Sequence, residues 1–427
     1  MKTQIKKNKV AVFDILFYYS GYRTDRGSRS ALQLNGELDI DILIKAFNKS
    51  IDLVPVLKSK WVVERFYYHW EVIPDFDIKN YMTVTYDSDE AENFLLETIN
   101  CETSPQIKVM IYRNKGKDTL QILFTHLCFD GSAIKNFHDL ISKYYTGLKR
   151  DENFVIKENL DLNRNLWSLF KNFTFKQRLK FAFRSVKRSR FDYKKWAYLE
   201  SDSAERKNVL LKNNIGEDIL LKLLEKTKKN GVKINDVFLA SLAKVYFTIS
   251  KENDSPLEFN CAFDLRSYIK GKRKLDFTNK VSRVKIIIDR IEGESFEELI
   301  SRVSKQMKDN KDNYFSMSGV EMFRLLPFLL RIPALKERIS KIYLGSNTLN
   351  ISNLGVIPND IFKFDEITAK DFFVAGSIRH RPPAGMSINT FNNIITIASV
   401  FKGTEKEIEH NKKNAEMFIS NIEKYVE

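Results

Sequence analysis

The chain has 427 residues, which is enough to bury one large hydrophobic core or two smaller ones. Hydrophobic residues make up 43% and aromatic residues 12% of it, which excludes a disordered chain, and no uncharged stretch approaches the ~18 residues that span a bilayer. Most of the net charge of +15 belongs to residues 164–195, where eleven Lys or Arg and one acid contribute +10.

The first half of the chain is predicted to alternate strands and helices. Strands are expected at residues 30–34, 56–61, 67–73, 81–86, 107–113 and 120–124. Helices are expected at 39–53, where Leu43, Ile44, Phe47 and Ile51 share one face, near 90–98, and at 132–145.

The second half, from residue 208, repeats this mixture. Helices are expected at 217–229, 231–249 with Asn235 as the N-cap, 296–310 and 405–426, and strands at 258–263, 281–288, 348–352 and 394–401. This pattern favours two packed α/β lobes. We expect an N-terminal lobe at 1–160, a basic amphipathic linker at 161–207 and a C-terminal lobe at 208–427.

Two interpretations of the basic linker stay open. Phe175, Leu179, Phe183 and Val186 recur at helical spacing among Lys and Arg. One interpretation is an inter-domain helix whose apolar stripe packs on a lobe while its charges are solvated. The other is an interfacial helix that anionic lipid headgroups attract, which the hydrophobic and basic stretch 323–341 supports. Nucleic acid is disfavoured, because no known binding motif accompanies the charge.

One short string gives the strongest indication of chemistry. Residues 124–131 read Phe-Thr-His-Leu-Cys-Phe-Asp-Gly, so His126 follows a strand and stands four residues before Asp130, with Gly131 next. An imidazole at a strand end is held rigidly, faces what lies beyond the sheet, and can take a proton near pH 7. His126 is therefore a candidate general base. The alternative is a buried histidine whose neighbours satisfy its ring, followed by an ordinary strand-to-helix turn.

With these residues in view, the chain resembles the superfamily of HxxxD acyltransferases. That group includes chloramphenicol acetyltransferase, the condensation domains of peptide synthetases, alcohol and polyketide-associated acetyltransferases, and wax ester synthases. Four matches follow in the family's order: 126–131, Ile-Asn-Asp-Val at 234–237, Phe-Asp-Leu-Arg at 263–266 and Ile-Ser-Asn-Leu-Gly at 351–355. The string Val-Pro-Val-Leu-Lys-Ser at 54–59 is similar to an early family stretch.

The resemblance implies an α/β fold of two chloramphenicol-acetyltransferase-like lobes. Each lobe would be a mixed sheet flanked by helices, and the two would form a V with a channel between them and His126 at its middle. Thr125 stands where condensation domains usually carry a first histidine. This departure favours the free-standing, single-histidine acetyltransferase branch.

The resemblance also implies roles for residues around the histidine. Asp130 would form a structural ion pair with Arg266 rather than relay charge, and Gly131 would give the backbone room to open the helix. Ser352 or Asn353 would donate to the oxyanion if the Ser-Asn-Leu-Gly turn faces the channel. For Asn353, making that turn is the slightly favoured role.

The implied function is transfer of an acyl group from a thioester to a hydroxyl or amine acceptor. The donor would be acyl-coenzyme A or an acyl carrier protein, with no bound metal or redox cofactor. The alternative is a non-catalytic or regulatory protein that binds a lipid or protein partner and whose histidine is vestigial. We expect a monomer.

Three further side chains have alternatives that stay open. Cys128 is expected on the same strand face as His126, so an acyl-cysteine is conceivable, although a small buried thiol is the commoner role. His138 is expected at the surface of the next helix. His380, between Arg379 and 381, lies in either a coenzyme A phosphate site or a solvent loop.

Cysteine usage indicates the compartment. Cys101, Cys128 and Cys261 are far apart and show neither a disulfide framework nor metal-ligand spacing. This favours a reducing cytoplasm, and with the basic linker the protein is expected to be cytoplasmic or peripheral to a membrane.

Overall fold

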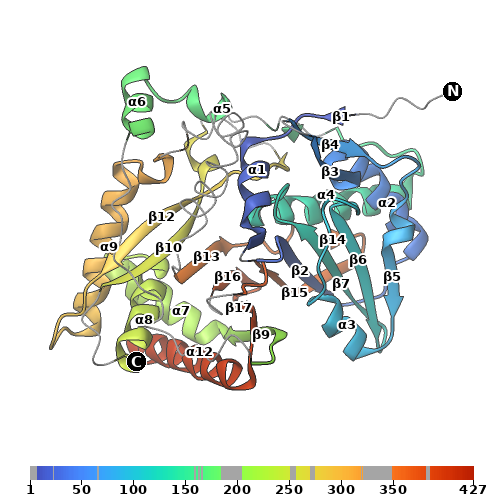
Figure 1. The fold of residues 1–427 in the computed structure, drawn as a ribbon. Coiled ribbons are helices and arrows are strands. Elements are labelled where there is room, and N and C mark those ends of the chain that lie inside the picture. The colour runs from blue at the N-terminus through green and yellow to red at the C-terminus, as the bar shows by residue number, and fades with distance from the viewer. Residues whose placement is uncertain are drawn as a thin grey trace.

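Two six-stranded sheets, each in its own lobe, form the frame of the computed structural model (Figure 1). The structure describes residues 7–22, 24–64, 67–157, 160–161, 164, 167–183, 204–250, 256–269, 275–318, 320, 349–380 and 385–427. Helices flank both sheets, and α1 (Val12–Tyr19) lies between the lobes in Figure 1. The expected α/β architecture of two lobes, each a mixed sheet with helices, is confirmed.

The first lobe is built mainly from the first half of the chain. Its sheet runs in the order β14 (Lys363–Phe364), β15 (Ile367–Ala375), β2 (Gly27–Leu34), β7 (Lys117–Thr125), β6 (Ile107–Asn114) and β5 (Met82–Thr85). Only β5 and β6 pair in parallel among these neighbours. A small antiparallel sheet of β1 (Lys7–Asn8), β4 (Tyr67–Val72) and β3 (Ser59–Glu64) adjoins it.

Two long helices of the first lobe pack on each other and on its core. These are α2 (Ile40–Leu53) and α4 (Gly131–Arg150), while the shorter α3 (Ser88–Phe94) packs near β5 and β6. Asp39 caps α2 by accepting from Ile42 N at 3.1 Å, and Pro55 follows its end. The apolar stripe of α4, which includes Phe137 and Ile141, is buried against the sheet.

The second lobe is built from the second half of the chain. Its sheet runs in the order β12 (Val281–Ile288), β10 (Leu257–Asp264), β13 (Leu349–Val356), β16 (Met386–Phe391), β17 (Ile394–Gly403) and β9 (Lys207–Ile215). β13 pairs in parallel with both of its neighbours. Among the described residues, the sheet is covered by α7 (Glu217–Lys229), α8 (Ile234–Ile249), α9 (Phe296–Asp312) and α12 (Glu405–Val426).

The lobes do not divide the sequence at residue 208. β14 and β15 come from the second half of the chain, yet they extend the first sheet, where Phe373 of β15 pairs with Ala31 of β2. We call β15 the inserted strand and β14–β15 the inserted hairpin. On β16, Asn389 Nδ2 donates to Phe372 O of β15 at 2.8 Å, which ties the inserted strand to the second sheet. The expected boundary of the C-terminal lobe at 208–427 is therefore wrong in this respect, because the hairpin β14–β15 belongs to the sheet of the first lobe.

Several boundaries differ from the sequence expectations. Helix α1 and strands β9, β15 and β16 were not predicted, and the strand expected at 348–352 is β13, which continues to Val356. Helix α8 is capped at Lys233, not at Asn235, and Asp236 Oδ2 accepts from Lys233 N at 3.0 Å. The other expected strands and helices are present within a few residues.

The basic linker is described only in part. Two short helices, α5 (Trp167–Phe170) and α6 (Phe175–Phe183), lie at the margin of the molecule in Figure 1. Phe175, Leu179 and Phe183 are exposed, so the expectation that this stripe packs on a lobe is wrong for α6. Val186, residues 184–195 and the stretch 323–341 lie outside the described residues. Among the helices that are described, none has the length and apolar character needed to cross a membrane.

Candidate active site

His126 lies in the turn that joins β7 to α4. β7 ends at Thr125 and α4 begins at Gly131. The backbone N–H of His126 donates to Arg26 O at 2.6 Å, which ties this turn to the segment before β2. Residues 127–130 are buried, whereas His126 is partly exposed. The histidine is therefore the part of the motif that solvent reaches.

Two distant segments hold the imidazole. Phe17 of α1 stacks on it with 4.2 Å between ring centroids and 23° between the planes. Asn279, fully buried, donates from Nδ2 to His126 O at 2.8 Å, and the same Nδ2 lies 3.4 Å from the ring Nδ1. Asn279 N also donates to Cys128 O at 3.2 Å. The ring is thus held between α1 of the first half and a loop of the second half.

The environment favours a neutral imidazole. Burial lowers the pKa of His126 below its usual value, and attraction to Asp130 and hydrogen bonding with backbone groups of His126 and Phe129 offset this only in part. A neutral ring keeps one nitrogen with a free lone pair near pH 7. It can therefore accept a proton there.

Asp130 points into the fold, where it forms the expected ion pair with Arg266. Arg266 Nη1 lies 2.9 Å from Asp130 Oδ2, and Lys280 N donates to the same oxygen at 2.7 Å. Oδ1 accepts from Ala133 N at 2.9 Å and so caps α4. Burial opposes ionisation of Asp130, but attraction to Arg266 and these hydrogen bonds outweigh it and lower its pKa.

A second buried ion pair lies beside the first. Lys280 is fully buried and its ammonium bonds the carboxylate of Asp276, which also lies 3.5 Å from Arg266 Nε. Two cations and two carboxylates therefore alternate behind the histidine turn, which compensates their burial. The more exposed Asp264 adds a third carboxylate, 3.0 Å from Arg266 Nη1.

Gly131 lies where α4 approaches β13. A Cβ at this position would come within 2.6 Å of Leu354 Cδ2, much closer than carbon atoms pack. The glycine therefore lets the start of α4 reach the second sheet, in addition to opening the helix as expected.

Ser352 and Asn353 lie on the neighbouring strand and not in a turn. Both belong to β13, which pairs with β16 up to Asn353 and then shifts register before Val356. Asn353 Oδ1 accepts from Gly355 N at 2.8 Å, and its Nδ2 lies 3.5 Å from Asn235 Oδ1. The expected turn is thus a bulged strand, and the amide of Asn353 makes its contacts within the second lobe.

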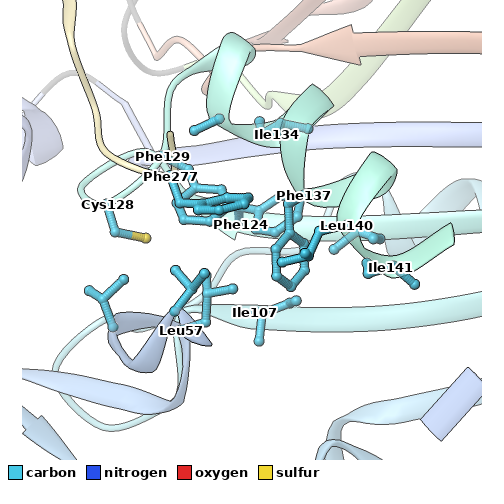
Figure 2. Packing of buried hydrophobic residues seen from close by; sticks show 14 of the residues in the cluster. Leu57, Ile107, Phe124, Cys128, Phe129, Ile134, Phe137, Leu140, Ile141 and Phe277 are labelled. Atoms are coloured by element: carbon cyan, nitrogen blue, oxygen red, sulfur yellow. The ribbon is translucent and has the colours of Figure 1, made fainter. Parts of the chain in front are cut away.

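Cys128 is not placed to form an acyl-enzyme. It lies in the turn after β7, so it does not share a strand face with His126, and its side chain is buried beside Phe129 and Phe277 (Figure 2). Its thiol lies 3.3 Å from Thr125 O. Burial raises the pKa of Cys128 to about 12, so the thiol stays protonated near pH 7.

The two other histidines considered above lie apart from this turn. His138 is fully buried, so its expected surface position is wrong; one ring nitrogen lies 2.9 Å from Ser30 Oγ, and burial lowers its pKa to about 3. His380 is exposed. Its backbone neighbour Arg379 forms bridges with Thr24 and Phe401, next to the inserted strand β15.

Solved structures with this architecture are numerous, although no family model matches the sequence and no curated protein matches it. Polyketide synthase associated protein 5 from Mycobacterium tuberculosis superposes with a TM-score of 0.71 at 13% identity, over 98% of this chain and 97% of that one. The epimerization domain from the third module of tyrocidine synthetase B gives 0.68 at 15%, over 99% and 96%. Trichothecene 15-O-acetyltransferase from Fusarium sporotrichioides gives 0.67 at 12%, over 98% and 94%.

Coverage of both chains is nearly complete in each case. The chain has the chloramphenicol acetyltransferase-like fold. At these identities the match extends to the fold, and the chemistry of this chain has to be argued from its own residues.

Within this fold, sequence reasoning missed the residues that hold the histidine. Phe17 lies in a helix that was not predicted, and nothing in its local sequence distinguishes it from a core residue. Asn279 and Lys280 stand directly before β12. The sequence feature that singled out His126, a polar residue at the end of a strand, could also have drawn attention to Asn279 and Lys280.

No metal centre emerges from the part of the chain that the structure describes. Among those residues, no group of three or more His, Cys, Asp or Glu side chains is arranged to hold a metal ion.

Proposed function

We propose that this protein transfers an acyl group from a thioester to a hydroxyl or amine acceptor, with His126 as the general base. The observation that carries the proposal is that His126, a partly exposed residue, has a neutral ring held between the two halves of an acyltransferase-like fold. Structures with this fold include a protein named as an O-acetyltransferase. The two buried ion pairs behind the turn supply the rigidity that a positioned base requires.

The proposed reaction needs one group that moves a proton. The acceptor O–H or N–H bond breaks as its lone pair attacks the thioester carbonyl, and the proton passes to His126. The tetrahedral intermediate then collapses, the C–S bond breaks, and the thiolate takes that proton from the imidazolium. The imidazole returns to its neutral form, so the cycle balances without a further reactant.

The oxyanion of the intermediate needs a hydrogen-bond donor. Ser352 is the proposed donor, because the amide of Asn353 already contacts Gly355 and Asn235. Ser352 stands on β13, the strand whose Leu354 meets the start of α4. We propose that donor and acceptor enter beside this contact between the lobes.

The test is release of free thiol from acetyl-coenzyme A, longer acyl-coenzyme A and acyl carrier protein, each with a panel of alcohols and amines. With a productive pair, His126→Ala should lower kcat/KM by roughly 100-fold or more, the size expected for removing a general base. His410→Ala, which changes a histidine on α12 of the second lobe, serves as the matched control. It should keep the wild-type rate.

The outcomes separate catalysis from binding. Acceptor-dependent thiol release that disappears only in His126→Ala supports the proposal. Equal, slow hydrolysis in wild type and His126→Ala would contradict it and favour a non-catalytic protein that binds a lipid or protein partner.

A further inference from the structure

Helix α6 presents its apolar face to solvent. The side chains of Phe175, Leu179 and Phe183 are 74%, 43% and 77% exposed. They are spaced four residues apart, so they lie on one face of the helix. Exposed apolar side chains gathered on one face mark an interaction surface, unlike those scattered singly.

The opposite face fixes α6 to the protein. Phe181 is 1% exposed and packs against Phe173 and Tyr314, with 5.1 and 6.0 Å between ring centroids. At the start of the helix, Thr174 N donates to Gln177 Oε1 at 2.8 Å, and Gln177 N donates to Thr174 Oγ1 at 3.3 Å. This reciprocal capping box and the buried Phe181 define the orientation of α6. The exposed stripe is therefore its outer face.

Positive charge surrounds the exposed stripe. Lys176 and Lys180 are exposed and lie beside it on the helix, and Lys171 is exposed just before it. The sequence contains no Asp or Glu between Asp161 and Asp192. Within the described part of this segment, residues 167–183, every charged side chain is a cation, and an apolar stripe with such neighbours fits a surface that is negatively charged outside and apolar beneath.

We propose that α6 docks on the surface of an anionic lipid bilayer. Phe175, Leu179 and Phe183 would enter the boundary between headgroups and acyl chains, and Lys176 and Lys180 would meet the lipid phosphates. A nucleic acid would use the lysines but offers no apolar layer for a leucine between two phenylalanines. The bilayer accounts for both parts of the surface.

This inference goes beyond the proposed acyl transfer and does not depend on it. Vesicle binding is measured without donor or acceptor, so either proposal can fail while the other stands.

The test is flotation of the full chain with vesicles in a density gradient. The vesicles contain phosphatidylcholine alone, or phosphatidylcholine and phosphatidylglycerol in equal parts. The test variant is the double change Phe175→Ser and Phe183→Ser. Because both side chains are exposed in the wild type, replacing them should leave the fold intact. The matched control is Leu221→Ser with Leu224→Ser on α7, where the side chains are 54% and 45% exposed and acidic residues stand among the lysines.

We expect wild type and the α7 control to float with the mixed vesicles and to stay unbound with phosphatidylcholine alone. The α6 double variant should bind the mixed vesicles at least about tenfold more weakly than wild type, because it loses two inserted aromatic rings. Lys176→Glu with Lys180→Glu should also abolish binding to the mixed vesicles. Binding of wild type should weaken as salt is raised, because salt screens the attraction between lysines and phosphates.

Three results would overturn the proposal. One is absence of wild-type flotation with the mixed vesicles. The second is equal binding by the α6 and α7 double variants. The third is unchanged flotation of the α6 double variant together with loss of its binding to a single-stranded oligonucleotide that wild type binds, which would assign the exposed stripe to nucleic acid.

Discussion

Both oxygens of the Asp130 carboxylate are occupied by donors. Oδ1 accepts from Ala133 N, and Oδ2 accepts from Arg266 Nη1 and Lys280 N, at 2.7 to 2.9 Å. The carboxylate therefore joins the start of α4 to the loop that carries Asn279. Its effect on His126 is to support the turn, and it takes no proton from the ring.

Replacing Asp130 should mainly lower the stability of the protein, because its carboxylate supports the turn and takes no part in proton transfer. We expect Asp130→Ala to lower the free energy of unfolding by about 3–5 kcal/mol, because it removes one partner of a buried ion pair and the cap of α4. Urea unfolding measures this. Asp52→Ala is the control, since Asp52 is 67% exposed and its pair with Lys58 should matter little.

The same experiment has a pH readout. The folded-state pKa of Asp130 is lowered, so its stabilisation is present above the ordinary carboxyl pKa of about 4 and is lost as pH falls through the lower, folded value. The difference between wild type and Asp130→Ala should shrink over that range. A variant as stable as wild type at pH 7 would contradict this account of the carboxylate.

The positions of site residues could be predicted where the residues are neighbours in a sequence motif. They could not be predicted where only folding brings distant residues together. His126, Asp130 and Gly131 are neighbours in the sequence, so their string was enough to place them at a strand end. Phe17 and Asn279 reach the same imidazole from positions 109 residues before it and 153 residues after it. No local pattern encodes such contacts, and the same limitation placed His138 at the surface although it is buried.

At the scale of elements, the decisive contact is between α4 and β13. Gly131 begins α4, and Leu354 projects toward it from β13, leaving no room for a Cβ. An added Cβ must displace the Leu354 side chain or push the helix start, which carries the Asp130 cap, away from the strand that carries Ser352.

A double-mutant cycle tests this contact. We expect Gly131→Ala to destabilise the protein by about 1–3 kcal/mol through overpacking, and Leu354→Ala to relieve most of that penalty in the double variant. Gly216→Ala is the control, because a Cβ there meets nothing within 4 Å. Thermal unfolding measures wild type, the three variants of the cycle and the control, and additive effects of the two changes would contradict a direct contact.

Periodicity predicted most elements but not how strands are interrupted. The helices α2, α7, α9 and α12 carry regular apolar stripes and were expected close to their observed bounds. The string 351–355 contains Asn and Gly, which usually indicate a turn. Pairing with β16 instead keeps it as a strand with a register shift, because tertiary hydrogen bonds outweigh the local preference.

At the scale of the whole molecule, the inserted hairpin couples the lobes. β15 pairs with β2 of the first sheet and is bonded by Asn389 of the second. A separate buried cluster also includes side chains of both lobes, among them Leu123 of β7 and Val400 of β17.

Such coupling predicts one cooperative unfolding transition. In a variant with Trp167→Phe and Trp196→Phe, the fluorescence comes from Trp61 and Trp70, which are buried in the first lobe, while far-UV circular dichroism reports on both lobes. The two signals should change at the same urea concentration. Two separate transitions, or a stable isolated fragment of residues 1–160, would show that the hairpin does not couple the lobes.

The two-lobed α/β architecture was predictable from alternating elements and from the ordered motifs. The crossing of β14 and β15 into the first sheet was not, because strand pairing over such sequence separations leaves no periodic signal in either partner.

The most direct test of the central claim is the pH dependence of acyl transfer, measured as kcat/KM for thiol release. If neutral His126 is the base, activity should fall on the acid side with an apparent pKa below 6.5, because burial lowers the pKa of this ring. The rate should be flat from there to neutral pH, and residual activity of His126→Ala should lack this limb. An acid limb that persists unchanged in His126→Ala would contradict the assignment.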